Sequence, residues 1–264
     1  CSSNIPRKLS FTGSVPVGKH LQKLAAENMI RCTMELGGHS PLMVFNDTDI
    51  EKAAQISVAG KFRNAGQVCV SPTRFLVQDD IKDKFTQAVI EETNKIKVGN
   101  GLEDDTNMGP LIAERRIDVM NDFVKDAIDN GANIEMGGNR MNRVGSFFSP
   151  TVMSGVDDSA KIMNEEPFGP LLPIDTFKSV DEVIDRANRL DFGLASYAFT
   201  NDPKIVDNLR SEIQAGLLAV NSTVVSTPET PFGGIKHSGY GSEGGVEGLE
   251  AFLVTRFVSE TYNI

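Results

Sequence analysis

A cysteine in a loop is the first candidate for chemistry. Cys69 follows Gly66-Gln67-Val68, directly after a segment of helical periodicity that the glycine ends. A thiol just beyond a helix end is better exposed than a thiol packed in a core, and the thiolate form of cysteine is a strong nucleophile. The alternative is a core thiol, because free cysteine is among the most buried residue types. The local pattern leaves both interpretations open.

Two acidic residues lie where the chain must bend. Glu35 precedes Leu36 to Pro41, where two glycines forbid regular continuation and the proline restrains its neighbour. Glu166 stands at the head of a second rigid stretch, Glu166 to Pro170, before a predicted strand. A surface acid at a strand end is the alternative interpretation of Glu35.

The elements that would position these residues begin with a βαβ unit. A strand is predicted over Lys8–Phe11, a turn at Thr12-Gly13-Ser14, an apolar helical face within residues 17–25 and a second strand over Thr33–Leu36. Gly13 would let the backbone approach a ligand, and the N-terminus of the following helix suits a phosphate. A plain turn in an α/β protein is the alternative.

Strands and helices alternate through the rest of the chain. Helices are predicted over residues 50–62, 81–96, 117–128, 180–190 and 203–213, and strands over residues 74–78, 132–136, 147–153, 171–177, 195–200 and 217–221. Such alternation predicts an α/β fold in which helices cover both faces of a mostly parallel sheet. Any site is then expected at the carboxyl ends of the strands.

The C-terminal part has a different composition. Phe232 to Gly248 is dense in glycine and is predicted to be a loop that wraps other elements. Ala251 to Val258 is predicted to be a strand, and no partner for it lies nearby in the sequence. A terminal strand of this kind often pairs with another subunit.

Composition excludes several classes of protein. The chain has 264 residues, 40% hydrophobic and 23% charged, which is typical of a folded protein with a substantial core. Its formal net charge of -10 repels phosphate backbones, so nucleic acid is not an expected partner. No apolar run has the length of a membrane span, and residues 1–7 lack the apolar core of a signal peptide. We expect a cytoplasmic protein with no membrane partner.

Metal binding and disulfides are not expected either. Cys1, Cys32 and Cys69 are an odd number of cysteines, widely spaced, and the three histidines form no ligand pattern with them. The chain does not begin with methionine and runs almost at once into a predicted strand. We therefore expect a fragment of a longer polypeptide.

Five motifs together resemble the aldehyde dehydrogenase superfamily, and they occur in that family's order. They are Phe11-Thr12-Gly13-Ser14, Glu35 to Pro41, Gly66 to Cys69, Glu166 to Pro170 and Pro231 to Gly234. Phe62 to Cys69 and Ser238 to Gly241 are similar to succinate-semialdehyde and 2-oxoglutarate semialdehyde dehydrogenases.

The resemblance implies a division of the chain. Residues 1–35 would be the remnant of a Rossmann-like NAD(P)-binding domain, residues 36–236 an aldehyde dehydrogenase-like catalytic domain, and residues 237–264 a tail with the oligomerisation strand of a homo-oligomer. An asparagine that the family uses to stabilise the oxyanion would lie upstream of this chain.

The resemblance also implies roles for individual residues. Cys69 would be the nucleophile that forms a thiohemiacetal and then a thioester, and Glu35 the base that activates water for hydrolysis. The cofactor, NAD or NADP, would contact five residues, with Ser14 at the pyrophosphate and Glu166 at the nicotinamide ribose: Gly13, Ser14, Leu36, Glu166 and Phe168.

A carboxylate-bearing semialdehyde is the substrate that the resemblance implies. Arg63 would anchor the carboxylate, with Ser226 as a second donor and Phe232 as a pocket wall. The alternative for Arg63 is an ion pair with a nearby acid. Two alternatives to the whole function stay open: a dehydrogenase for a broader range of aliphatic and aromatic aldehydes, and a catalytically incomplete fragment that acts as a stable or interaction domain.

Overall fold

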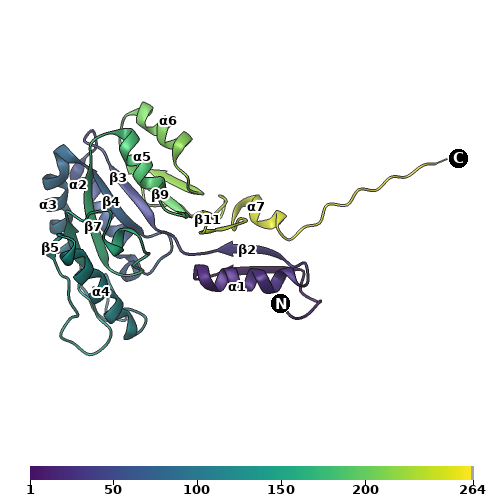
Figure 1. Ribbon diagram of the computed structural model, residues 1–264, viewed down its shortest axis with the longest axis horizontal. Helices are drawn as coiled ribbons and strands as arrows, with labels where there is room; N and C mark the ends of the chain where they lie inside the picture. Colours follow the sequence, from purple (N-terminus) through teal and green to yellow (C-terminus); the bar gives the residue numbers. More distant parts are fainter. Residues whose placement is uncertain (263–264) are drawn as a thin grey trace.

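A seven-stranded sheet forms the body of the computed structural model, which describes residues 1–262 (Figure 1). The strand order is β10-β9-β3-β4-β7-β6-β5, and every neighbouring pair is parallel except β5 with β6. The strands are β3 (Ser40–Val44), β4 (Pro72–Gln78), β5 (Asn133–Met136), β6 (Thr151–Ser154), β7 (Leu171–Phe177), β9 (Ala195–Phe199) and β10 (Leu217–Val220). The predicted α/β class with a mostly parallel sheet is confirmed.

Helices lie along the large sheet. The α-helices are α2 (Ile50–Phe62), α3 (Lys82–Thr93), α4 (Arg115–Asp129), α5 (Val180–Asn188) and α6 (Pro203–Glu212), and the 3-10 turns are η1 (Arg63–Gly66), η2 (Asp79–Ile81) and η3 (Lys161–Met163). Three of these helices begin at side-chain caps, where Asp49, Ser179 and Asp202 accept bonds from backbone N–H groups in the first turn. Among residues 1–262, no helix is both long and apolar enough to cross a membrane.

The sequence prediction missed the strand β3, although it lies near the middle of the sheet. Every residue of β3 is buried, as expected for a parallel strand covered on both faces. A proline argues against a central strand because it has no N–H to donate. Pro41 is accommodated because the pairing with β4 shifts register between Ser40 and Pro41.

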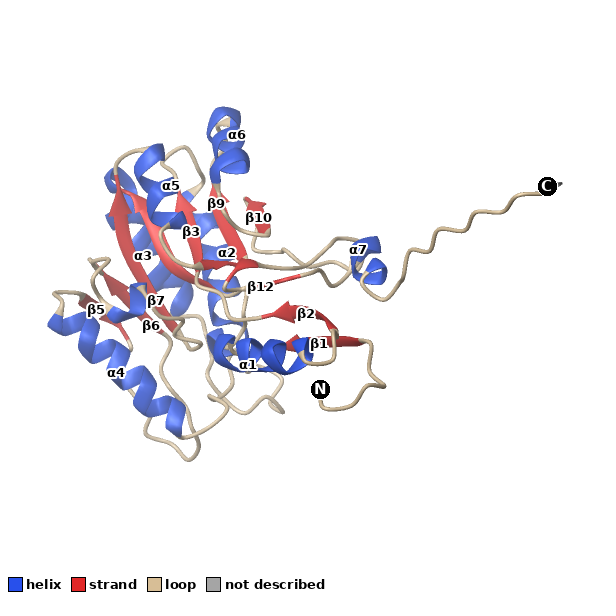
Figure 2. Cartoon of the chain, turned by 45° about the vertical axis from the view of Figure 1, so that its right-hand side comes forward, coloured by secondary structure: helices blue, strands red, loops and turns tan. Residues whose placement is uncertain are grey.

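A three-stranded sheet lies beside this body and joins the two ends of the chain (Figure 2). It consists of β1 (Lys8–Thr12), β2 (Arg31–Glu35) and β12 (Gly239–Tyr240), with β1 parallel and β12 antiparallel to β2. The helix α1 (Val15–Ala26) connects β1 to β2, which is the expected βαβ unit. The boundaries proposed at residues 35 and 237 stay a prediction. The pairing of β12 with β2 joins the proposed C-terminal tail to the proposed remnant of the cofactor domain.

The C-terminal predictions need correction. The stretch predicted as a glycine-rich loop contains β11 (Ile235–Lys236), which pairs with β8 (Phe192–Gly193), as well as β12 and α7 (Gly245–Glu250). The predicted strand over residues 251–258 is not formed, and the segment leads away from the body (Figure 1). A strand needs a partner for its N–H and C=O groups, and this segment pairs with none of the described strands.

Candidate active site

A strained turn delivers Cys69 to its position. The helix α2 ends at Phe62, and Asn64, Ala65 and Gly66 then adopt φ angles of 51°, 55° and 70°. A positive φ is uncommon for alanine, and such strain is concentrated at functional sites. A side chain at Gly66 would collide with the carbonyl oxygen of Gly169, so the loop before Cys69 packs directly on the Glu166–Pro170 segment.

Cys69 is half-buried in a tight turn at the carboxyl side of this loop. The Ser71 N–H donates to the Val68 carbonyl at 2.9 Å, which closes the turn immediately before β4. The Cys69 carbonyl oxygen lies 2.8 Å from the point where a Cβ on Gly38 would sit. The bend predicted at Gly37-Gly38 therefore brings the segment after Glu35 against the cysteine.

Charges around the thiol disfavour its ionisation at rest. Burial raises the pKa of Cys69, and the negative charges of Glu166 and Glu35 raise it further. The backbone N–H groups of Val70 and Cys69 oppose this by facing the sulfur. The structure therefore brings the three predicted residues within reach of one another's charges.

Glu35 is a buried acid without a hydrogen-bond partner. It ends β2, its side chain is 3% exposed, and neither carboxylate oxygen has a hydrogen-bond partner among residues 1–262. Burial raises the pKa of Glu35 to about 8, and the charge of Glu243 adds to this. Its Oε1 lies 3.4 Å from the Cβ position of Gly233, in the Pro231–Gly234 motif. Such a carboxyl exchanges protons near neutral pH, as a general base must.

Glu166 is held by the bend after Glu35. Its Oε1 accepts a bond from the Gly38 N–H at 3.3 Å, and its Oε2 occupies space that a side chain on Gly37 would need, 2.6 Å from the Cβ position. Burial raises the pKa of Glu166 to about 7, while the Gly38 N–H and the cations Lys61 and Arg116 oppose the rise.

The rest of the Glu166–Pro170 segment is fixed from α4. The Arg116 guanidinium donates to the carbonyl oxygens of Pro167 and Phe168. Phe168 has a φ of 44° and its ring is 36% exposed. A strained backbone therefore presents an aromatic ring at the surface beside Glu166.

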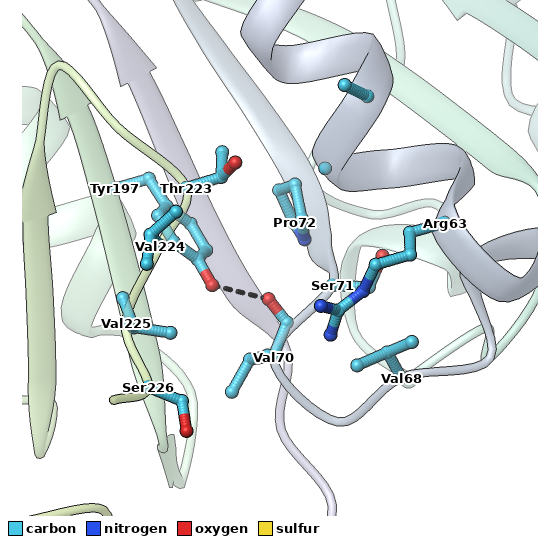
Figure 3. A pocket seen from close by; sticks show the side chains of 12 residues that line it. Arg63, Val68, Val70, Ser71, Pro72, Tyr197, Thr223, Val224, Val225 and Ser226 are labelled. Carbon is cyan, nitrogen blue, oxygen red and sulfur yellow. Dashed lines mark hydrogen bonds between the residues drawn. The ribbon is translucent and has the colours of Figure 1, made fainter. Parts of the chain in front are cut away.

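A pocket of about 270 Å³ opens beside the Cys69 loop (Figure 3). Its lining combines valines, small polar residues, an aromatic ring and a cation: Ala59, Gly60, Arg63, Val68, Val70, Ser71, Pro72, Tyr197, Thr223, Val224, Val225 and Ser226. The flanking residues Val68 and Val70 place Cys69 at the edge of this pocket. Arg63 and Ser226 approach it from different segments, whereas Phe232 is not among the residues that line it.

Arg63 reaches the pocket without a counter-ion. Its side chain is exposed, and it takes part in none of the ion pairs formed within residues 1–262. The hydrogen bond drawn in Figure 3 joins the Tyr197 hydroxyl to the Val70 carbonyl at 2.6 Å. Phe232 instead forms a bridge with Glu243, donating to and accepting from its backbone.

The remaining predicted cofactor residues directly follow strands of the small sheet, Gly13 and Ser14 after β1 and Leu36 after β2. Gly13 is already engaged, because its N–H donates to the Glu35 carbonyl at 3.0 Å and the Phe11 ring covers its Cα. The N–H of Leu36 donates to the Ser238 carbonyl. Ser14 is exposed at the N-cap of α1, and its hydroxyl makes no capping bond. That hydroxyl and the helix N-terminus are available to a phosphate.

Two residues at the site were not found from the sequence. Tyr197 is part of the buried strand β9, where an aromatic residue is indistinguishable from core. Lys61 is 0% exposed and lies one turn after the buried Ser57 on α2. The sequence did contain a signal for Lys61. It lies four residues after Ser57, so helical periodicity places both side chains on the buried face of α2. Among the described residues, no cluster of three or more His, Cys, Asp or Glu side chains could hold a metal ion.

A mostly parallel α/β architecture, a thiol on a strained loop and a buried acid whose charge acts on that thiol define an α/β protein with a candidate cysteine site. The family model "Aldehyde dehydrogenase family" matches residues 1–258, and the chain belongs to that family.

Relatives and a solved structure agree with this assignment. A putative 4-(hydroxymethyl)benzenesulfonate dehydrogenase of Comamonas testosteroni is 44% identical over 97% of this chain and 54% of that protein. The NADP(+) succinate-semialdehyde dehydrogenase of Escherichia coli is 39% identical over 97% of this chain and 53% of that protein. A betaine aldehyde dehydrogenase structure from Staphylococcus aureus, in complex with NAD+, has a TM-score of 0.90 at 39% identity and covers 95% of this chain and 52% of that one. The chain thus spans about half the length of these relatives.

Proposed function

We propose that this protein oxidises an aldehyde that carries a remote anionic group, a succinic semialdehyde-like compound, to the corresponding acid with NAD or NADP as oxidant. The observation that carries the proposal is Arg63, a cation without a counter-ion in the pocket beside Cys69. Because the net charge of -10 repels an anionic substrate, a local cation has to supply the attraction.

The proposed reaction begins at the sulfur of Cys69. The thiolate attacks the aldehyde carbon and gives a thiohemiacetal, whose oxygen the Cys69 backbone N–H would stabilise. NAD(P), when bound, supplies the hydride acceptor that turns this adduct into a thioester. Glu35 then takes a proton from water as the water attacks the thioester, the C–S bond breaks, and the acid leaves with the Cys69 thiolate restored.

The residues present fit such a cofactor. Glu166 has carboxylate oxygens oriented by the Gly38 N–H, and an acid so held can accept bonds from ribose hydroxyls. Phe168 presents its ring beside it, and Ser14 with the N-terminus of α1 offers a phosphate site. The choice between NAD and NADP stays open, since the relatives named above include one of each.

The pocket supports an anion as the distal group of the substrate. Arg63 can bind a carboxylate with two parallel hydrogen bonds, and the Ser226 hydroxyl is a further donor on the same pocket. The names of the relatives include both a semialdehyde carboxylate and a benzenesulfonate. A sulfonate presents the same charge, so sulfonate-bearing aldehydes form a second arm of the test.

The test compares charged and uncharged aldehydes in wild-type and Arg63→Met enzymes. We expect kcat/KM for succinic semialdehyde to fall about 100-fold, the value of a charge-assisted hydrogen-bond pair, while kcat/KM for pentanal changes less than about threefold. Arg210→Met, at an exposed arginine on α6, is the matched control. An equal loss for both aldehydes would remove the anchor role and favour a broad aldehyde range. Failure of NAD and NADP to bind in calorimetry would favour the non-catalytic alternative.

We also propose that the tail joins two copies of the chain. Phe252, Leu253, Val254, Phe257 and Val258 are exposed apolar residues within the predicted strand over residues 251–258. Pairing with a second copy would satisfy the backbone of this segment and cover these side chains. Light scattering of a chain ending at Glu250 should give a smaller assembly than the full chain; identical masses would refute the pairing.

A further inference from the structure

Lys61 is a buried cation that the chemistry proposed above does not use. It lies in the last turn of α2 with a side chain that is 0% exposed, and its Nζ has no hydrogen-bond partner in the described part of the chain. An unpaired ammonium in a protein interior is strongly unfavourable, so buried lysines are almost always paired. A nearby negative charge is needed to offset the cost of burying this ammonium.

The surroundings of Nζ show what that charge faces. Nζ lies 3.3 Å from the Cβ position of Gly66, and the carbonyl oxygen of Gly169 reaches that same position. The ammonium is therefore at the contact between the strained Cys69 loop and the Glu166–Pro170 segment. It lies behind both, on the side away from solvent.

The charged groups around this contact are few. Glu166 is the acid whose charge acts on Lys61, and Arg116 acts on the same acid from α4. Burial lowers the pKa of the His39 ring, and the charges of Arg74, Lys61 and Arg189 lower it further. Lys61 is thus one of two cations acting on Glu166, and it is the fully buried one.

We propose that Lys61 is a positioning residue whose ammonium, acting through its charge and not through a hydrogen bond, holds the Glu166 carboxylate in the orientation that receives the nicotinamide ribose. The inference rests on the proposed role of Glu166 in cofactor binding. Lys61 itself is fully buried behind Glu166, so it acts on the cofactor only through that acid. Burial lowers the pKa of Lys61 and raises the pKa of Glu166, both to about 7. The attraction between the two charges opposes both shifts.

The first test is Lys61→Met, with Ser57→Ala as its matched control. Ser57 is also fully buried on α2, one turn earlier, with an unpaired hydroxyl. Without cofactor, we expect amide hydrogen exchange of Leu171 and Thr151, whose N–H groups donate to the Gly169 and Pro170 carbonyls, to quicken about tenfold in Lys61→Met and to stay unchanged in Ser57→Ala. Unchanged exchange in both variants would overturn the proposal, and Lys61→Gln replaces the methionine variant if that variant does not fold.

The second test is a double-mutant cycle on cofactor affinity with Glu166→Gln. Lys61→Met should weaken NAD(P) binding about tenfold in the wild-type background and have almost no effect once Glu166 is neutral. Loss of the cation raises the pKa of Glu166, so the pH midpoint of cofactor affinity should move to higher pH. Equal losses in the two backgrounds would show that Lys61 acts on something other than Glu166.

The two tests separate this inference from the proposed function. If the wild-type protein bound neither NAD nor NADP, the proposed function would fail, whereas the exchange comparison would still decide whether Lys61 holds the segment. If the wild type bound cofactor and Lys61→Met bound it equally well, only the role of Lys61 would fail.

Discussion

Two buried cations on neighbouring elements, Arg74 and Lys61, differ in their hydrogen bonding. Arg74 on β4 donates to the carbonyls of His39, Arg186 and Ala187 at 3.0, 2.8 and 2.9 Å. The Nζ of Lys61, in the last turn of the preceding helix α2, has no hydrogen-bond partner among the described residues. Burial lowers the pKa of both side chains, to about 9 for Arg74 and to about 7 for Lys61. Arg74 therefore stays charged at neutral pH, while Lys61 lies near its titration midpoint.

The two cations belong to regions that differ in the same way. Charged groups near Arg74 have partners, whereas several buried charged groups near Cys69 have none among the described residues. Around Arg74, charges have partners: Arg186 forms ion pairs with Asp158 and Asp175 at 2.8 and 2.6 Å. Around Cys69, the Nζ of Lys61 and both carboxylate oxygens of Glu35 are buried without a hydrogen-bond partner from residues 1–262. Satisfied charges fix elements in place, and unsatisfied ones are free to act on a ligand. Mutations in the two regions should accordingly affect different properties.

The largest expected effect is on activity alone. Cys69→Ala should lower kcat at least about 1000-fold, because no other group replaces the nucleophile, while the free energy of unfolding changes by less than about 1 kcal/mol. Steady-state kinetics and urea unfolding measure the two quantities. Cys32→Ser, at a half-buried thiol on β2, is the control and should keep its activity. Substantial activity in Cys69→Ala would refute the nucleophile assignment.

Arg74→Met should produce the largest loss of stability. Three carbonyl oxygens would lose a charged donor in a buried position, so we expect the free energy of unfolding to fall by about 3–5 kcal/mol. Urea unfolding followed by circular dichroism provides the measurement. A loss below about 1 kcal/mol would contradict the structural role given to the satisfied cation.

The stability of Glu35→Gln relative to the wild type should depend on pH. The folded-state pKa is about 8 against an ordinary value of 4.5, so the folded protein binds the proton more tightly. The contribution of Glu35 to stability is therefore full below pH 4.5 and is lost as the pH rises towards 8. As the pH rises between these two values, the free energy of unfolding of the variant should increase by about 1–3 kcal/mol relative to that of the wild type. The variant should also lose activity. Unfolding at several pH values tests this, and parallel stability curves would contradict it.

The smallest expected effect is at the ion-pair network. Asp158→Asn removes the charge that Arg186 binds through two nitrogens, at 2.8 and 2.9 Å, and should cost about 1–2 kcal/mol of stability. Asp207→Asn, whose pair with Arg210 is exposed on α6, should change stability by less than about 0.5 kcal/mol. Equal effects at the two sites would show that burial of the pair contributes nothing.

Local patterns in the sequence determined most of the elements. The strand Leu171–Phe177 was predicted at its observed bounds, and the cap at Asp202 with Pro203 marked the start of α6. Caps, turns and hydrophobic periodicity depend on neighbours within a few residues, so they can be read directly. The motifs also drew attention to Cys69, Glu35 and Glu166, which the structure brings within reach of one another's charges.

Only the tertiary structure decided which charges are satisfied. Lys61 and Arg74 are both cations in apolar surroundings, and the sequence does not distinguish the one with three partners from the one with none. The segment from Ala251 to Val258 has the composition of a strand, yet it stays unpaired among the described elements. Burial, pairing and pKa depend on segments that meet across long distances in the chain, and no local pattern records that approach.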